Sequence, residues 1–396
     1  MYRIGQEEID AVANVILNGR MFRVMDPNAP VHEVLDFERD MKAYLNVENY
    51  FLLTSGKGAL ISGLVALGIG PGDEVLVPAY TYIATALAVL AAGAIPVIVD
   101  VDDSCTMSPT AVEAAITPNT KAIIPVHMQG MPADMAALCA IAEKHGIYVL
   151  EDACQAMGGS FQGKKLGTWG DAGAFSYNYF KNISAGEGGG LTTKSREVYE
   201  RAYIYHDSSG SPYFGKELEN LDEYLHAGSE FRANEITAAI LRVQLGRLDG
   251  ILADLHRSRN ALWDRIKDAG YVLGRSNDFQ GECGNILRFA FENEATAEKF
   301  SKLASAFVPG EQPIHTGKHV CWAWEILFRH KGAFHDKMNP FFMEANQGLR
   351  MNYDRDMCPA SRKEMARNAY VYIRPEWTEE KIDTIAKGLC DIAKQL

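Results

Sequence analysis

The stretch that decides the fold is residues 74–99, EVLVPAYTYIATALAVLAAGAIPVIV. It begins with a short apolar run, Glu74 to Val77, and ends with another, Ile95 to Val99. Between them, residues 83–91 have the pattern of a helix. Short strands that are nearly all apolar are buried on both faces of a sheet. The stretch therefore predicts a strand–helix–strand unit of an α/β fold.

The same alternation of β-rich runs and helical patterns extends over residues 50–195. Further helices are expected at 57–67, 109–116 and 132–145, and further strands at 121–126 and 147–150. This order predicts a mostly parallel sheet. Ligands of such sheets bind beyond the carboxyl ends of the strands. The rule directs attention to Tyr80-Thr81-Tyr82, His127 and residues 151–155.

Beyond residue 195 helices dominate, and a long one is predicted from Ala233 to Leu255. We expect it to lead out of a large domain, with its N-terminal arm, in residues 1–250, into a small α+β domain in residues 251–396. In the small domain we expect helices at 260–269, 296–307 and 378–394 and a strand at 285–291. Residues 331–361, rich in Met, Asn, Asp and Phe, are expected to form an active-site or interface loop.

Composition argues against several kinds of partner. The net charge is -12 and no cluster of Lys and Arg could neutralise a run of phosphates, so neither nucleic acid nor an anionic membrane is expected to bind. The longest apolar stretch, 83–97, is interrupted by Gly and Pro and is shorter than the ~20 residues of a membrane helix. The N-terminus MYRIGQEEID is acidic, unlike a signal peptide, so we expect a cytoplasmic protein. Seven cysteines without a CxxC pair predict reduced thiols and no metal site.

A glycine-rich segment, residues 175–193, FSYNYFKNISAGEGGGLTT, carries the predicted chemistry. Lys181 lies between two expected strands, ahead of glycines that let backbone approach a ligand. Lysine titrates near ~10.4, so it acts as a nucleophile at neutral pH only after desolvation, beside a cation or as an imine. Lys181 is therefore a candidate for a buried lysine that binds a cofactor. The alternative is an ordinary exposed loop lysine.

Four segments, taken together and in this order, resemble the DegT/StrS family of sugar aminotransferases. They are residues 54–60 (TSGKGAL), 77–85 (VPAYTYIAT), 151–158 (EDACQAMG) and 175–189. The match extends from the N-terminal arm to at least residue 250. It implies a fold-type-I transferase dependent on pyridoxal 5'-phosphate (PLP), with a mostly parallel sheet in the large domain and a smaller α+β C-terminal domain.

The resemblance implies a role for each residue around the cofactor ring. Lys181 forms a Schiff base with PLP, and it also acts as the acid and base of the reaction. Asp152 contacts the pyridinium nitrogen and keeps it protonated, so that the ring can draw off electrons. Gln155 lies near the ring hydroxyl, and Tyr82 lies against a ring face, where it adds stacking.

At the phosphate end, the resemblance implies binding by Gly56 and Lys57 at a helix N-terminus and by Ser176. Unpaired amides and the helix dipole there suit a phosphate dianion. Position 57 departs from the family, which usually has Thr. The amide contact survives this change, whereas the hydroxyl is lost and an ammonium group can replace it.

A second departure lies in residues 228–232, GSEFR, where the family has GxNxR with an Asn that reaches the phosphate of the neighbouring subunit. Glu230 beside a phosphate would be repulsive. Either Glu230 turns away and Arg232 or Lys57 supplies the charge, or the contact between subunits is different here.

The implied reaction moves an amino group from glutamate or glutamine to the carbonyl of a sugar, in a homodimer with shared active sites. Residues 181–189, KNISAGEGG, resemble a subgroup of the family that aminates the C8 aldehyde of an oxidised 3-deoxy-manno-octulosonate for lipopolysaccharide, and this resemblance implies that substrate. The segment also resembles the enzymes of nucleotide-linked keto-sugars and of inososes, which are the alternatives. His315 and His319 are substrate candidates or packing residues. A PLP-dependent sugar dehydratase is a further alternative, but its lysine is commonly replaced by histidine. A non-catalytic regulatory protein is the other.

Overall fold

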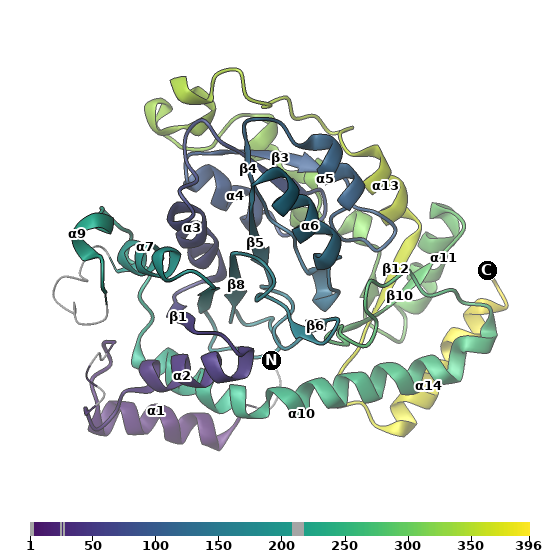
Figure 1. Cartoon of the computed structure of the whole chain (residues 1–396). Helices are drawn as coiled ribbons and strands as arrows, with labels where there is room; N and C mark the ends of the chain where they lie inside the picture. Colours follow the sequence, from purple (N-terminus) through teal and green to yellow (C-terminus); the bar gives the residue numbers. More distant parts are fainter. Residues whose placement is uncertain (1–3, 24–25, 27, 208–217) are drawn as a thin grey trace.

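The computed structural model describes residues 4–23, 26, 28–207 and 218–396 (Figure 1). Within them, a seven-stranded sheet has the order β1-β9-β8-β5-β4-β2-β3. Its strands are β1 (Asn49–Leu53), β2 (Glu74–Pro78), β3 (Ile95–Val99), β4 (Thr120–Ile123), β5 (Tyr148–Asp152), β8 (Ala172–Ser176) and β9 (Gly189–Thr193). Only β9 is antiparallel to its neighbours, β1 and β8. The prediction of a mostly parallel sheet is confirmed.

Helices cover both faces of this sheet, and a separate cluster of buried hydrophobic residues lies under each face. One face carries α2 (Glu33–Leu45), α5 (Pro109–Ala115), α6 (Met135–His145) and α10 (Glu235–Ile266). The other carries α3 (Gly56–Ala66), α4 (Ala84–Ala91) and α7 (Arg196–His206). Every residue of β1, β2, β8 and β9 is buried, which explains their lack of polar alternation.

The long helix α10 differs from the prediction. Helices were expected at 233–255 and 260–269, but one unbroken helix runs to Ile266, and a 3-10 turn follows (Lys267–Ala269). Leu255, Ser258, Arg259 and Leu262 are buried along it, so packing continues through the expected break. The helix packs on α2 at one end and on α14 (Glu379–Ala393) at the other (Figure 1). The boundary at residue 250 falls inside it, and the division into two domains stays a prediction.

The C-terminal part contains a three-stranded antiparallel sheet in the order β10-β12-β11. Its strands are β10 (Ile286–Ala290), β11 (Gly310–Glu311) and β12 (Asn368–Tyr372). The helix α11 (Glu294–Ala304) packs on β11 and β12, and α14 packs on α11 and α10. The strand expected at 285–291 and the helices expected at 296–307 and 378–394 are therefore confirmed, whereas β12 was not predicted. The remaining elements are α1 (Gln6–Asn18), the hairpin strands β6 (Ser160–Phe161) and β7 (Lys164–Lys165), α9 (Leu221–Tyr224), α12 (Glu325–Phe328), α13 (Pro359–Ala366) and short 3-10 turns at Met128–Gly130, Pro313–His315, Gly317–His319 and Cys321–Ala323.

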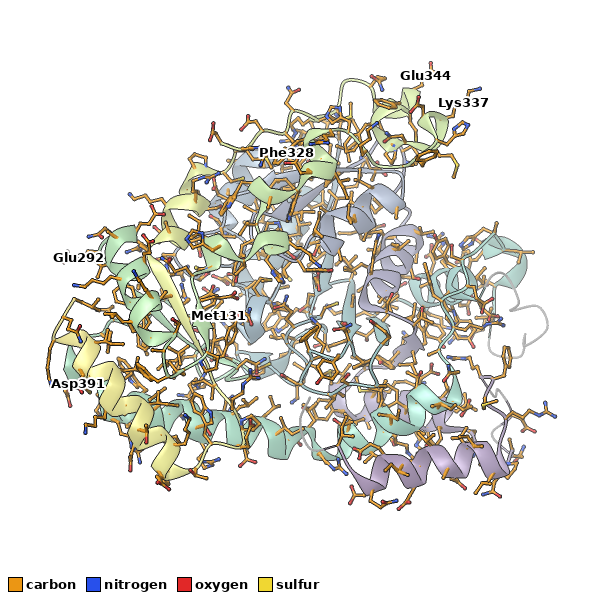
Figure 2. All side chains as sticks on the ribbon, turned by 180° about the vertical axis from the view of Figure 1, so that it is seen from behind. Met131, Glu292, Phe328, Lys337, Glu344 and Asp391 are labelled. Carbon is orange, nitrogen blue, oxygen red and sulfur yellow. The ribbon has the colours of Figure 1, made fainter. Side chains whose placement is uncertain are left out.

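Residues 331–361 form short 3-10 turns, Asp336–Met338, Pro340–Phe342 and Glu344–Asn346, followed by a strap over the edge of the large sheet. Arg350 pairs with Glu74 of β2, and the Tyr353 hydroxyl donates to the Pro96 carbonyl of β3 (2.7 Å). Figure 2 shows Lys337 and Glu344 at this outer end of the molecule, far from Asp391 of α14. The segment therefore protects an edge strand.

No helix in the described ranges is long and apolar enough to cross a membrane. Among the same residues, no group of three or more His, Cys, Asp or Glu side chains is placed to hold a metal ion.

Candidate active site

A cavity of about 780 Å³ opens beyond the carboxyl ends of β2, β5 and β8, and we call it the Lys181 cavity. The sequence separates its walls by more than a hundred residues, because consecutive βα units bring different loops to the same edge of a parallel sheet. All seven residues predicted for the site line it: Gly56, Lys57, Tyr82, Asp152, Gln155, Ser176 and Lys181. No residue of the segment 331–361 lines it, so among the described residues that segment is not an active-site loop of its own chain.

The N-terminus of α3 forms one end of the cavity. The Ser55 hydroxyl accepts from the Gly58 amide (3.0 Å), which leaves the amides of Gly56 and Lys57 without a protein partner among the described residues. A Cβ atom on Gly56 would lie 2.7 Å from Cys154 Sγ and 2.8 Å from Ser176 Cβ, so only glycine fits. The result is a backbone cradle with free donors, aided by the helix dipole, that suits an anion.

Lys57 lies on the same turn, with its side chain exposed. In the described part of the chain its ammonium group has no carboxylate partner. Desolvation by the surrounding protein lowers its pKa below the ordinary lysine value. An anion bound beside this ammonium group would offset the desolvation through a favourable charge interaction.

Asp152 is the last residue of β5 and is only 5% exposed. Its Oδ2 accepts from the Thr85 hydroxyl (2.7 Å), and its Oδ1 accepts from the Cys154 amide (3.1 Å). Thr85 belongs to the segment 77–85, but the sequence did not predict a role for it. Its position one turn after Tyr82 is the signal that could have identified it.

Gln155 and Tyr82 occupy other walls of the cavity. The Gln155 side-chain oxygen accepts from the amide of Gln129 (3.1 Å), which fixes its orientation. The Tyr82 ring is 41% exposed, and its centroid lies 5.4 Å from that of His319 and 5.8 Å from Lys318 Nζ. An aromatic face of this size left open to a cavity is available for a planar ligand.

The two histidines are separated by the structure. His319 lines the cavity, and its pKa is lowered, first by burial and also by the positive charges of Lys181 and Lys318. His315 is exposed, and it is absent from the cavity wall within the described residues. His319 is therefore the better substrate candidate.

Lys181 lies in the loop between β8 and β9, as predicted. Asn182 Nδ2 donates to the Met157 carbonyl (3.0 Å) and the Ser184 hydroxyl donates to the Tyr177 carbonyl (3.1 Å), so the loop is held on both sides. Lys181 Nζ has neither a hydrogen bond nor an ion pair to any described residue. A half-buried amine without a partner, in a cavity, is available for covalent chemistry.

Three other residues at the strand ends have structural roles and lie outside the described cavity wall. Tyr80 and the pair His127–Glu151 are almost fully buried, and none belongs to the described cavity wall. His127 Nε2 lies 3.1 Å from Glu151 Oε2. The Glu151 carboxylate also accepts from the amides of Gly167 and Gly170, each at 2.8 Å. A carboxylate satisfied in this way fixes a loop and is not available to a substrate.

Glu230 turns toward Arg232, which pairs with it (2.6 Å) and with Asp207 (2.9 Å). Neither Glu230 nor Arg232 appears among the described residues that line the Lys181 cavity. Of the two candidate cations in the described residues, Lys57 lines the cavity and Arg232 does not. A contact of Arg232 with a neighbouring subunit stays a prediction.

A family model supplies the decisive comparison: residues 3–308 match the DegT/DnrJ/EryC1/StrS aminotransferase family. The chain belongs to this family. It is 39% identical over 241 residues to the dTDP-3-amino-3,4,6-trideoxy-alpha-D-glucose transaminase of Streptomyces venezuelae, covering 60% of each chain. It is 46% identical over 197 residues to the UDP-N-acetyl-3-dehydro-alpha-D-glucosamine 3-aminotransferase of Acidithiobacillus ferrooxidans, covering 49% of this chain and 51% of the relative.

These alignments span about half to three fifths of the curated relatives they match. The comparison with solved structures covers a larger share of both chains. The crystal structure of 3-amino-5-hydroxybenzoic acid synthase superposes with a TM-score of 0.78 at 28% identity, over 100% of this chain and 98% of that one. The fold-type-I architecture of this family member is therefore shown over its full length.

PLP is the cofactor of the family, and the residues of the Lys181 cavity fit it. The glycine cradle at α3 and its two unpaired amides suit a phosphate. The buried Asp152 suits a protonated ring nitrogen, and Lys181 offers an unpaired amine. The role of each residue toward the cofactor stays a prediction.

Proposed function

We propose that this protein is a PLP-dependent aminotransferase that moves an amino group from glutamate or glutamine to the carbonyl of a keto-sugar. The observation that carries the proposal is the position of Lys181 Nζ, unpaired among the described residues and in one cavity with Asp152 and the α3 N-terminus. This combination is what a covalently bound pyridine cofactor with a phosphate requires.

Different residues of the chain would bind the cofactor and move the proton. The amides of Gly56 and Lys57 and the Ser176 hydroxyl would bind the phosphate, and Asp152 would hold the ring nitrogen protonated. Bound PLP supplies an electron sink for a substrate carbon that loses a proton. Lys181 Nζ, once displaced by the amine of the donor, is the base that takes this proton and the acid that returns it.

Two cationic side chains of the Lys181 cavity support an anionic donor. Lys318 and Arg374 line the cavity, both with exposed side chains, and neither forms an ion pair with a carboxylate in the described part of the chain. The guanidinium of Arg374 can bind a carboxylate with two parallel hydrogen bonds. Glutamate, which carries two carboxylates, would engage such groups better than a neutral amine.

The acceptor is proposed to be a keto-sugar, and a nucleotide-linked one in the first instance. The names of two similar proteins refer to amino transfer on dTDP-linked and UDP-linked sugars. The polar walls offer hydroxyl partners in Asn178, Asn285 and Glu311. Neither of these two names refers to the octulosonate aldehyde that residues 181–189 suggested, so we rank it below the keto-sugars.

A homodimer with shared active sites is part of the proposal. Tyr179 and Phe180, beside Lys181, are 51% and 85% exposed, and Phe22, on which Arg232 stacks, is 54% exposed. Phe180 lines the Lys181 cavity, and exposed aromatic side chains of this kind suit a protein interface. A second subunit would cover the cavity mouth and exclude water.

The test is a half-reaction. The purified protein, loaded with PLP, is mixed with glutamate and then with glutamine, while the cofactor absorbance and the release of 2-oxoglutarate or its amide are followed. We expect bleaching together with release of the oxo acid, and loss of both in Lys181→Ala. A spectrum indifferent to both donors would instead support the regulatory alternative. A panel of nucleotide-linked keto-sugars, an inosose and oxidised octulosonate then identifies the acceptor.

A further inference from the structure

A second cavity, of about 620 Å³, lies at the opposite end of β8 and β9 from Ser176, and we call it the Lys164 cavity. Ala172 and Thr193, which pair with each other at that end of the sheet, both line it. The hairpin β6–β7 and residues 44–48, which begin in the last turn of α2, complete its wall. It shares no described lining residue with the Lys181 cavity.

Three lysines line the Lys164 cavity. Lys164 Nζ lies 4.8 Å from the centroid of the Trp169 ring, and Lys194 Nζ donates to the Trp169 carbonyl, so these two ammonium groups meet at one residue. Lys165 Nζ donates to the Tyr44 hydroxyl (3.0 Å) and also stacks on the Tyr44 ring (4.3 Å). All these partners are neutral.

Carboxylates are scarce around these cations. Glu48 is the one acidic residue in the described lining, and no ion pair joins Lys164, Lys165 or Lys194 to a described carboxylate. The pKa of Lys164 is lowered, first by desolvation and then by the charge of Lys194. The charge of the buried Glu151 partly offsets this shift, but Glu151 is not among the described residues that line the cavity. A cavity whose described lining has three lysines and one carboxylate thus carries net positive charge on a protein whose net charge is -12.

One side of the cavity wall is held by hydrogen bonds and close packing. Residues 167–170 are held by the buried Glu151, whose carboxylate accepts from the amides of Gly167 and Gly170, each at 2.8 Å. A Cβ atom on Gly173 would lie 2.0 Å from the Gly167 carbonyl oxygen, which shows how closely this loop packs on β8. A ligand would therefore meet preformed walls, and it would lose little affinity to reordering of the loop.

We propose that the Lys164 cavity is a binding site for a small phosphorylated anion, separate from the Lys181 cavity. Lysine ammonium groups are compact point charges that bind phosphate oxygens well, and an anion would relieve the repulsion between Lys164 and Lys194. The volume accommodates a phosphate ester the size of a sugar phosphate.

The experiment uses the PLP-loaded protein, so that the phosphate cradle at α3 is filled, with pyrophosphate as the probe in isothermal titration calorimetry. We expect saturable binding that weakens as KCl is raised from 50 to 500 mM. In Lys164→Gln/Lys194→Gln, affinity should fall at least about tenfold, because two charge-assisted hydrogen bonds are lost. Both side chains are exposed, so the variant should fold like the original.

Lys302→Gln is the matched control, because this exposed lysine of α11 lies outside both cavities. It should bind pyrophosphate like the original protein. The proposal is overturned if pyrophosphate fails to bind up to millimolar concentration, or if the double variant binds as tightly as the control. Amino transfer is not the readout, so the result is independent of the proposed function.

Discussion

The Thr85 hydroxyl lies 2.7 Å from the Asp152 carboxylate and donates to its Oδ2. Thr85 Oγ1 is also 2.7 Å from Thr81 Oγ1, so the segment after β2 orients a carboxylate that ends β5. The other oxygen of Asp152 accepts from the Cys154 amide. The orientation of this carboxylate thus depends on a segment that lies almost seventy residues earlier in the sequence.

Replacement of Thr85 by Val should weaken PLP binding. The change keeps the shape of the side chain but removes the hydroxyl that donates to Asp152. Hydrogen bonds to charged groups contribute about 1.5 to 3 kcal/mol, so the dissociation constant should rise about tenfold or more. Titration of the apoprotein with PLP measures it. Thr85→Ser should retain most of the affinity, and equal affinities in all three proteins would contradict the role.

Lys57→Met should also weaken PLP binding, with a distinct dependence on pH. Because desolvation lowers the pKa of Lys57, its ammonium group deprotonates at a lower pH than an ordinary lysine. A charge that contacts the phosphate is present below that pKa and lost above it, so affinity of the original protein should decline as pH rises through it. The decline should be absent in Lys57→Met. Parallel pH profiles would place Lys57 away from the phosphate.

Gly56→Ala should destabilise the apoprotein by about 1 to 3 kcal/mol through overpacking. The new methyl group would lie 2.7 Å from Cys154 Sγ and 2.8 Å from Ser176 Cβ. Cys154→Ala removes one of these contacts and should restore part of the loss when combined with Gly56→Ala. Urea denaturation of the single and double variants gives the coupling. Strict additivity would show that the two sites do not touch.

Arg350→Ala should loosen the strap over the sheet edge. Burial raises the pKa of Glu74, but hydrogen bonds from Arg350 and Thr117 outweigh it and leave the pKa below its usual value. The pair therefore stabilises the fold above the ordinary carboxyl range, and this contribution is lost as pH falls. We expect a loss of about 1 to 3 kcal/mol at pH 7 that shrinks toward pH 4.

The measurement for this variant is urea denaturation at both pH values. Arg329→Ala provides the control, because Arg329 pairs with Glu325 and both side chains are exposed, 72% and 44%. Exposed pairs contribute little, so a change within about 0.5 kcal/mol is expected. A larger effect in the control than in Arg350→Ala would contradict the role of the strap.

The local pattern of the chain was enough to predict the parallel sheet and most helices of the large domain. Strands such as β2 and β3 are short and apolar because both faces are buried, and that requirement is visible in sequence. The continuity of α10 through residues 256–259 was not visible in the sequence, because it depends on burial of Ser258 and Arg259 by distant parts of the chain. The same limit explains why β12 was missed.

For the site, the sequence by itself determined which residues would meet: Gly56, Lys57, Tyr82, Asp152, Gln155, Ser176 and Lys181 all line one cavity. They were predicted from four short segments that resemble the family, and Lys57 was included although it departs from the family pattern. Only the tertiary structure decided how they are held, through Thr85 on Asp152 and Gln129 on Gln155. It also separated His319 from His315 and turned Glu230 onto Arg232. Such partners are chosen by the packing of segments remote in sequence, which a linear pattern does not encode.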